Sequence, residues 1–110
     1  KTVICSEILY PEYVSKHLDS IDFIVNQSNE AWFEDNTTLK NQMYASLIFR
    51  AIENRRSIIK AGNMTYSGIV YPSGQREKYD KKIDEKLKIS IKKHKEITFF
   101  NKTMNVLFNN

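Results

Sequence analysis

The sequence predicts an α+β domain in which two N-terminal amphipathic helices pack on a C-terminal antiparallel sheet. Apolar residues recur at three- and four-residue steps before residue 60, whereas strand-forming residues and turn signals dominate after Gly62. The chain has 110 residues and no linker-like stretch, so residues 1–110 are assigned to a single domain. Its composition, 41% hydrophobic and 27% charged, is typical of a folded globular chain rather than a disordered one.

The first helix is predicted over about residues 11–26. Pro11 suits a first helical turn because its ring fixes φ and its missing N–H would be unused there. The apolar residues that follow at three- and four-residue steps are Val14, Leu18, Ile21 and Val25. This spacing indicates an amphipathic helix with one buried face.

The second helix is predicted over about residues 38–60 and is expected to form the spine of the core. Asp35 to Thr38 supply side-chain oxygens that can cap its first turn, and Gly62 is expected to end it. The apolar row at steps of four is Leu39, Met43, Leu47 and Ala51, with Tyr44, Ile48 and Ile52 beside it. We therefore expect the ridge from Leu39 to Ile52 to be buried.

A hairpin is predicted directly after the second helix. Residues 64–71 are rich in strand formers, and the sequence Pro72-Ser73-Gly74 is typical of a turn. Residues 75–79 are then expected to return as the partner strand of an antiparallel sheet.

The end of the chain is predicted to add a second pair of strands, residues 97–100 and 104–108. Residues 78–95 stay ambiguous between helix and strand. Acid-before-base pairs at four-residue spacing favour a helix, whereas Leu87, Ile89 and Ile91 alternate with polar residues as in a strand. We favour a helix to about residue 86 and a strand after it.

Charge is divided unevenly along the chain. Residues 1–40 carry three Lys and seven acidic residues, whereas residues 41–110 carry fourteen basic and six acidic ones. The basic excess is concentrated in residues 76–95, which favours either a solvated face or contact with nucleic acid, an acidic protein or a membrane surface. The candidate nucleic-acid-binding residues are Arg76, Lys78, Lys81, Lys82, Lys86, Lys88, Lys92, Lys93, Lys95 and Tyr79.

The sequence predicts no catalytic site, no metal site and no cofactor. His17 and His94 are the only imidazoles, and their spacing does not make a metal-binding pair. The single cysteine, Cys5, is interpreted as a small buried apolar residue, as free cysteines usually are; the alternative, if a signal peptide was removed, is an unpaired thiol that could form an intermolecular bridge. A nucleophilic pair of Cys5 with His17 is not favoured, because nothing supplies a third, orienting group. His94 with Lys92 and Lys93 could form a ribonuclease-like arrangement, which requires an acid, a base and a cation.

Aromatic pairs are the candidates for a protein interface. Trp32 and Phe33 lie between the two predicted helices, and Phe99 and Phe100 are adjacent in a predicted strand. Adjacent strand residues point to opposite sides, so only one of the two Phe side chains can enter the core. Aromatic anchors of this kind supply much of the binding energy at protein interfaces.

The function predicted from these features is a small non-enzymatic protein that binds another macromolecule, as an inhibitor, accessory subunit or regulator. The alternatives are a nucleic-acid-binding module that uses residues 76–95 and a minimal ribonuclease or toxin. The expected partner is another protein, a homo-oligomer stays open, and no apolar stretch is long enough for an integral membrane protein. Because the chain starts at Lys1 without Met, a processed or secreted origin is a further expectation.

Overall fold

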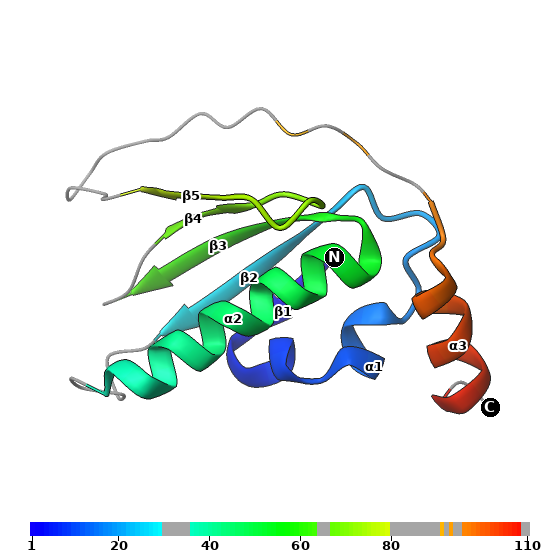
Figure 1. Cartoon of the computed structure of the whole chain (residues 1–110), viewed down its shortest axis with the longest axis horizontal. Helices are drawn as coiled ribbons and strands as arrows, with labels where there is room; N and C mark the ends of the chain where they lie inside the picture. Colours follow the sequence, from blue (N-terminus) through cyan, green and yellow to red (C-terminus); the bar gives the residue numbers. More distant parts are fainter. Residues whose placement is uncertain (30–35, 64–66, 80–90, 92, 94–95, 109–110) are drawn as a thin grey trace.

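The computed structural model describes residues 1–29, 36–63, 67–79, 91, 93 and 96–108. Its centre is a five-stranded mixed sheet with the strand order β1-β2-β3-β4-β5 (Figure 1). The strands are β1 (Thr2–Ile4), β2 (Phe23–Asn29), β3 (Ser57–Asn63), β4 (Ser67–Val70) and β5 (Arg76–Tyr79). β1, β2 and β3 are parallel, and β4 and β5 are antiparallel additions. An α+β fold is therefore confirmed, but the purely antiparallel sheet is wrong.

The parallel strands follow from the helical crossovers between them. The chain leaves β1 through η1 (Cys5–Leu9) and α1 (Pro11–Ser15), and it leaves β2 towards β3 through α2 (Thr37–Asn54). Parallel neighbours need such crossovers, whereas antiparallel neighbours can be joined by a tight turn. Figure 1 shows α2 and α1 on one side of the sheet.

The long helix predicted over residues 11–26 is wrong beyond its first turns. α1 ends at Ser15, His17 has a left-handed backbone with φ 55°, and the chain then enters β2. Val14, Leu18 and Ile24 are buried in the core all the same. The apolar spacing was wrongly taken as evidence for one long helix. A helical turn followed by a strand that is buried between two neighbouring strands can produce the same apolar steps of three and four.

The second predicted helix is confirmed for most of its length, but it ends before the predicted boundary. α2 stops at Asn54, and Arg55 caps it in a left-handed conformation with φ 48° and ψ 46°. The Arg55 N–H donates to carbonyls of the last turn, which satisfies acceptors that the helix leaves open. Gly62, the predicted stop, lies inside β3 instead.

The core lies between α2 and the sheet. Val3, Ile24, Ile58 and Val70 of the sheet pack with Met43, Leu47 and Ala51 of α2. Leu39 and Ile52, at the two ends of the predicted ridge, are exposed. The ridge is thus buried only in its middle part.

The predicted hairpin is confirmed, with β4 and β5 as its strands and Gly74 in the turn. Gly74 has φ 90°, which L-residues rarely adopt, and its N–H donates to the Tyr71 carbonyl at 2.8 Å. A Cβ atom added to Gly74 would lie 2.9 Å from Cδ1 of Ile52. The turn therefore packs directly on α2. Most of the ambiguous stretch after β5 lies outside the described residues.

The second predicted strand pair is wrong, because these residues form α3 (Phe99–Phe108). Thr98 and Asn101 cap the start of this helix reciprocally. The Thr98 Oγ1 accepts from the Asn101 N–H at 3.1 Å, and the Asn101 Oδ1 accepts from the Thr98 N–H at 3.0 Å. This local capping overrides the strand preference of the aromatic residues that follow Thr98. In the part of the chain that the structure describes, no helix is long and apolar enough to cross a bilayer.

Candidate functional site

The carboxyl ends of the parallel strands lie at one edge of the sheet, at the arrowheads of β2 and β3 in Figure 1. Ligands of sheets with parallel strands bind preferentially outside these ends. Cys5 follows the last residue of β1 directly, and it is the first residue of η1. A thiol is therefore placed where a site is most expected in this fold.

The backbone of Cys5 is strained. Its φ of 50° lies in the left-handed region, which non-glycine residues rarely occupy, and its side chain is half-buried. Conformations of this kind persist only where the surrounding structure enforces them, and they concentrate at functional sites. A sharp strand-to-helix turn also holds the nucleophile in one large class of hydrolases.

Glu7 fixes the backbone on the amino side of Cys5. Its Oε1 accepts a hydrogen bond of 2.6 Å from the Ile4 N–H. The same carboxylate raises the pKa of the Tyr13 hydroxyl, first through a hydrogen bond and then through its charge. Lys1 Nζ packs 5.0 Å from the centre of the Tyr13 ring and donates to the carbonyls of Tyr13, Val14 and Lys16. Burial lowers the pKa of this lysine, while Glu7 acts in the opposite direction.

Asn26 fixes the backbone on the other side of Cys5. It is fully buried, and its Nδ2 donates to the carbonyls of Val3 at 3.2 Å and Cys5 at 3.4 Å. Its Oδ1 is buried and has no hydrogen-bond partner among the described residues. In the sheet register Asn26 lies opposite Lys60, a buried residue whose Nζ donates to Ser28 Oγ at 3.2 Å. Polar side chains thus accumulate beside the end of β1.

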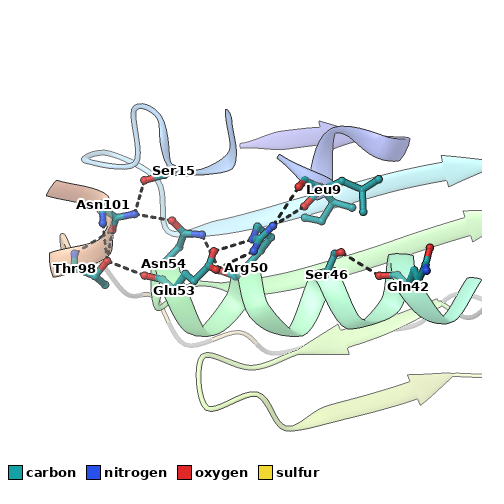
Figure 2. A network of polar contacts seen from close by, with 10 residues as sticks. Leu9, Ser15, Gln42, Ser46, Arg50, Glu53, Asn54, Thr98 and Asn101 are labelled. Atoms are coloured by element: carbon teal, nitrogen blue, oxygen red, sulfur yellow. Dashed lines mark hydrogen bonds and ion pairs between the residues drawn. The ribbon is translucent and has the colours of Figure 1, made fainter. Parts of the chain in front are cut away.

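A second polar cluster joins the three helices at the other end of the molecule (Figure 2). Asn101 Nδ2 donates to Ser15 Oγ at 2.8 Å and to Asn54 Oδ1 at 2.6 Å. Arg50 forms a bidentate pair with Glu53, both bonds at 2.8 Å, and also donates to the Leu9 carbonyl at 3.5 Å. Because its members bond mainly to one another and to backbone carbonyls, this cluster is structural.

Arg56 completes the internal polar structure near the end of α2. It is fully buried, and its guanidinium donates to the carbonyls of Ile21, Asn54 and Leu18 at 2.8, 3.0 and 3.3 Å. Burial lowers its pKa, whereas Glu96 and Asp22 act to raise it. In the described part of the chain, no three His, Cys, Asp or Glu side chains are grouped as metal ligands.

The residues predicted as binding candidates lie on different elements. Arg76 is on β5, where its guanidinium stands 5.5 Å from the centre of the Tyr44 ring. Lys93 is exposed, and Phe99 and Phe100 begin α3. The side chains of Lys78 and Tyr79 in β5 lie outside the description, as do all atoms of Trp32, Phe33, Lys81, Lys82, Lys86, Lys88, Lys92 and Lys95.

The residues that converge at the end of β1 were missed by the sequence reasoning. Cys5 was interpreted as a buried apolar residue, and Glu7, Asn26 and Lys60 were given no role. A usable signal was present, since Thr2, Val3 and Ile4 are strand formers and the cysteine follows them directly. The left-handed φ and the contacts to Asn26 come from tertiary structure, and no local pattern shows them.

Several known proteins are similar to this chain over about two thirds of its length. An apolipoprotein N-acyltransferase of Rickettsia prowazekii (strain Madrid E) is 32% identical over 75 residues, which cover 68% of this chain and 15% of that protein. The enzyme of the same name from Allorhizobium ampelinum is 33% identical over 73 residues, covering 66% of this chain and 14% of that protein. The one from Synechocystis sp. is 35% identical over 74 residues, with 66% and 14% coverage. No family model matches the chain.

The chain spans about a seventh of the length of these relatives, which are enzymes by name. The prediction of a non-enzymatic inhibitor, accessory subunit or regulator is therefore wrong. The alternatives of a nucleic-acid-binding module and a minimal ribonuclease or toxin are overturned by the same finding. A protein partner and a homo-oligomer remain predictions.

Proposed function

We propose that this chain is the thiol-bearing part of an N-acyltransferase, in which Cys5 carries the acyl group as a thioester. The observation that supports this most is the half-buried Cys5 at the carboxyl end of β1, held at φ 50°. A non-glycine residue in this conformation costs on the order of 1–3 kcal/mol. A cysteine at this position is therefore expected only if its thiol has a function. The names of the relatives supply the reaction class.

Acyl transfer through a thiol proceeds in two steps. The Cys5 sulfur attacks the carbonyl carbon of an acyl donor, a base takes the thiol proton, and the donor's leaving group departs with a proton. The nitrogen of an amine then attacks the thioester, the C–S bond breaks, an amide forms and the thiol regains its proton. By likeness to the relatives, we propose an apolipoprotein amine as the acceptor.

Glu7 and Asn26 act as positioning residues in this proposal. Glu7 holds the Ile4 N–H and Asn26 holds the Cys5 carbonyl, so the backbone on both sides of the thiol is fixed by side chains. A small displacement of a reacting group can lower a rate by orders of magnitude, because the attack requires a defined geometry. We therefore expect both side chains to affect the rate more than the binding of an acyl donor.

The test is to trap the thioester. The protein is incubated with an acyl donor and without amine, and the modified peptide is identified by mass spectrometry before and after hydroxylamine treatment. We expect a hydroxylamine-sensitive acyl group on Cys5 and complete loss of acyl transfer in Cys5→Ala. The matched control is Ser6→Ala, a change at the exposed neighbouring residue, which should retain activity.

An acyl group found only on another residue, or full transfer activity in Cys5→Ala, would overturn the proposal. Circular dichroism of Cys5→Ala distinguishes loss of chemistry from loss of fold. Because a left-handed Ala is strained to a similar degree as a left-handed Cys, this variant should unfold at a temperature close to that of the parent chain.

A further inference from the structure

Lys60 interrupts an apolar strand in the middle of the sheet. β3 pairs with β2 on one side and with β4 on the other, and Lys60 directly follows Ile58 and Ile59. The lysine is only 3% exposed. A buried ammonium loses its hydration, which is costly unless interactions within the protein replace it. An apolar residue would fill this position without that cost, so the charge itself requires an explanation.

Lys60 lies on the face of the sheet that packs against α2. Residues two apart in a strand share a face, and Ile58, two residues before Lys60, belongs to the core. The register pairs Ile58 with Ile24 and Lys60 with Asn26, and Ile24 is a core residue as well. Asn26 and Lys60 are therefore neighbours on one face, with backbones about 4.8 Å apart.

The Lys60 side chain runs past Asn26 towards the carboxyl edge of the sheet. Its Nζ donates to Ser28 Oγ at 3.2 Å, and Ser28 lies two residues beyond Asn26 on β2. Gly62 is the register partner of Ser28, and it has no side chain that could block this path. The ammonium therefore lies at the level at which β1 ends and Cys5 begins η1.

The Asn26 amide connects Lys60 to the thiol-bearing residue. Its Nδ2 donates to the carbonyls of Val3 and Cys5, at 3.2 and 3.4 Å, so the nitrogen is turned towards β1. The amide oxygen lies on the other side of the planar group, where β3 borders β2, and it has no hydrogen-bond partner among the described residues. A positive charge on β3 attracts this oxygen, which favours the observed orientation of the amide over the reversed one.

We propose that Lys60 is a positioning residue for Cys5 and that it acts through Asn26. Its ammonium holds the oxygen side of the Asn26 amide, so the nitrogen side keeps its bonds to the two carbonyls around the strained turn. The inference rests on the proposed role of Cys5 as the nucleophile. It concerns the position of the thiol rather than the chemistry of the acyl group.

The kinetics of acyl transfer by the full chain test this inference. Lys60→Met keeps the length of the side chain and removes its charge. We expect kcat to fall about tenfold while KM for the acyl donor changes by less than about twofold, because a displaced nucleophile reacts slowly without weakening donor binding. Lys60→Arg keeps the charge and should recover most of the lost rate. Lys102→Met, the same change at an exposed residue of α3, should match the parent chain.

Alkylation of Cys5 by iodoacetamide tests the position of the thiol without an acyl donor. In the native state, the rate in Lys60→Met should differ from the parent rate by more than about threefold, in the same direction as in Asn26→Ala. Adding Lys60→Met to Asn26→Ala should change the rate by less than about 1.5-fold, because the amide through which Lys60 acts is already absent. This measurement remains valid even if acyl transfer does not use Cys5, so failure of the proposed function and failure of this inference are distinguishable.

Three results would overturn the inference. The first is a parent-like kcat and alkylation rate in Lys60→Met, and the second is a loss in Lys60→Arg as large as that in Lys60→Met. The third is a double variant in which the effects of Lys60→Met and Asn26→Ala multiply, since the two residues would then act independently. Replacing a buried charge by an apolar residue of similar length commonly leaves stability unchanged or raises it, so Lys60→Met should unfold at no lower a temperature than the parent chain. The comparison of Met with Arg decides the matter even if Asn26→Ala does not fold.

Discussion

A buried asparagine is central to the polar contacts at each end of the molecule, Asn101 at the helical end and Asn26 at the strand end, and the two differ in how completely they are hydrogen-bonded. Asn101, between the helices, has partners for both its amide nitrogen and its oxygen. Asn26, beside Cys5, donates to two carbonyls but has a buried oxygen with no partner among the described residues. Buried polar groups are nearly always satisfied in stable packing. The helical end is therefore organised for stability, and the strand end retains an incompletely satisfied group next to a strained residue.

The largest effect is expected at the helical end. Asn101→Ala leaves Ser15 and Asn54 buried with lost partners, and it should lower the free energy of unfolding by about 3 kcal/mol. The measurement is urea denaturation followed by circular dichroism. In Asn101→Ala, the rate at which iodoacetamide alkylates Cys5 under native conditions should equal that of the parent chain.

The matched control for this variant is Asn105→Ala, which removes a half-buried amide from the same helix. It should change the free energy of unfolding by less than about 0.5 kcal/mol. Equal effects of the two variants would mean that the contacts of Asn101 with Ser15 and Asn54 contribute little.

A smaller loss of stability, with a larger effect on the thiol, is expected at the strand end. Asn26→Ala removes the donors to the Val3 and Cys5 carbonyls and should cost about 2 kcal/mol. It should also change the native-state alkylation rate of Cys5, because the backbone that carries the thiol is no longer fixed. Gln27→Ala, at an exposed amide of the same strand, is the control and should change neither quantity. An unchanged alkylation rate in Asn26→Ala would remove Asn26 from the positioning role.

The smallest change in the free energy of unfolding is expected for glycine substitutions at the left-handed residues of the two ends, Cys5 with φ 50° and Arg55 with φ 48°. Glycine adopts this conformation without the steric cost that a Cβ atom imposes. Cys5→Gly and Arg55→Gly should therefore each raise the free energy of unfolding by about 1 kcal/mol. Only Cys5→Gly should abolish acyl transfer. A destabilised Cys5→Gly would show that the thiol contributes to packing, as the sequence-based interpretation held.

The sequence predicted those parts of the fold whose structure is determined locally. The middle of α2 shows its apolar row in the sequence, and the β4–β5 hairpin shows its turn residues. The strand β2 was hidden, because pairing with β1 and β3 on both edges decides its conformation and the apolar spacing fitted a helix as well. In α3, the Thr98–Asn101 capping pair was a local signal, but the adjacent Phe residues favoured a strand.

The candidate site was much less predictable than the fold. A single cysteine carries little information in a sequence, because most free cysteines are simply buried. The significance of Cys5 comes from the end of a parallel strand, a left-handed φ and a contact with Asn26, which is 21 residues away in the chain. Conversely, the Lys-rich residues suggested a nucleic-acid-binding function because a sequence shows where its charged residues are. It does not show which groups those residues contact in the folded protein.

The close approach of Gly74 to Ile52 has a practical consequence for protein engineering. Hairpin turns are usually tolerant places for an inserted epitope or a fluorescent label. Here the turn rests on α2, and Gly74 has a backbone that other residues rarely adopt. An insertion there would lift the hairpin from the helix, so reporters for this protein are better attached elsewhere on its surface.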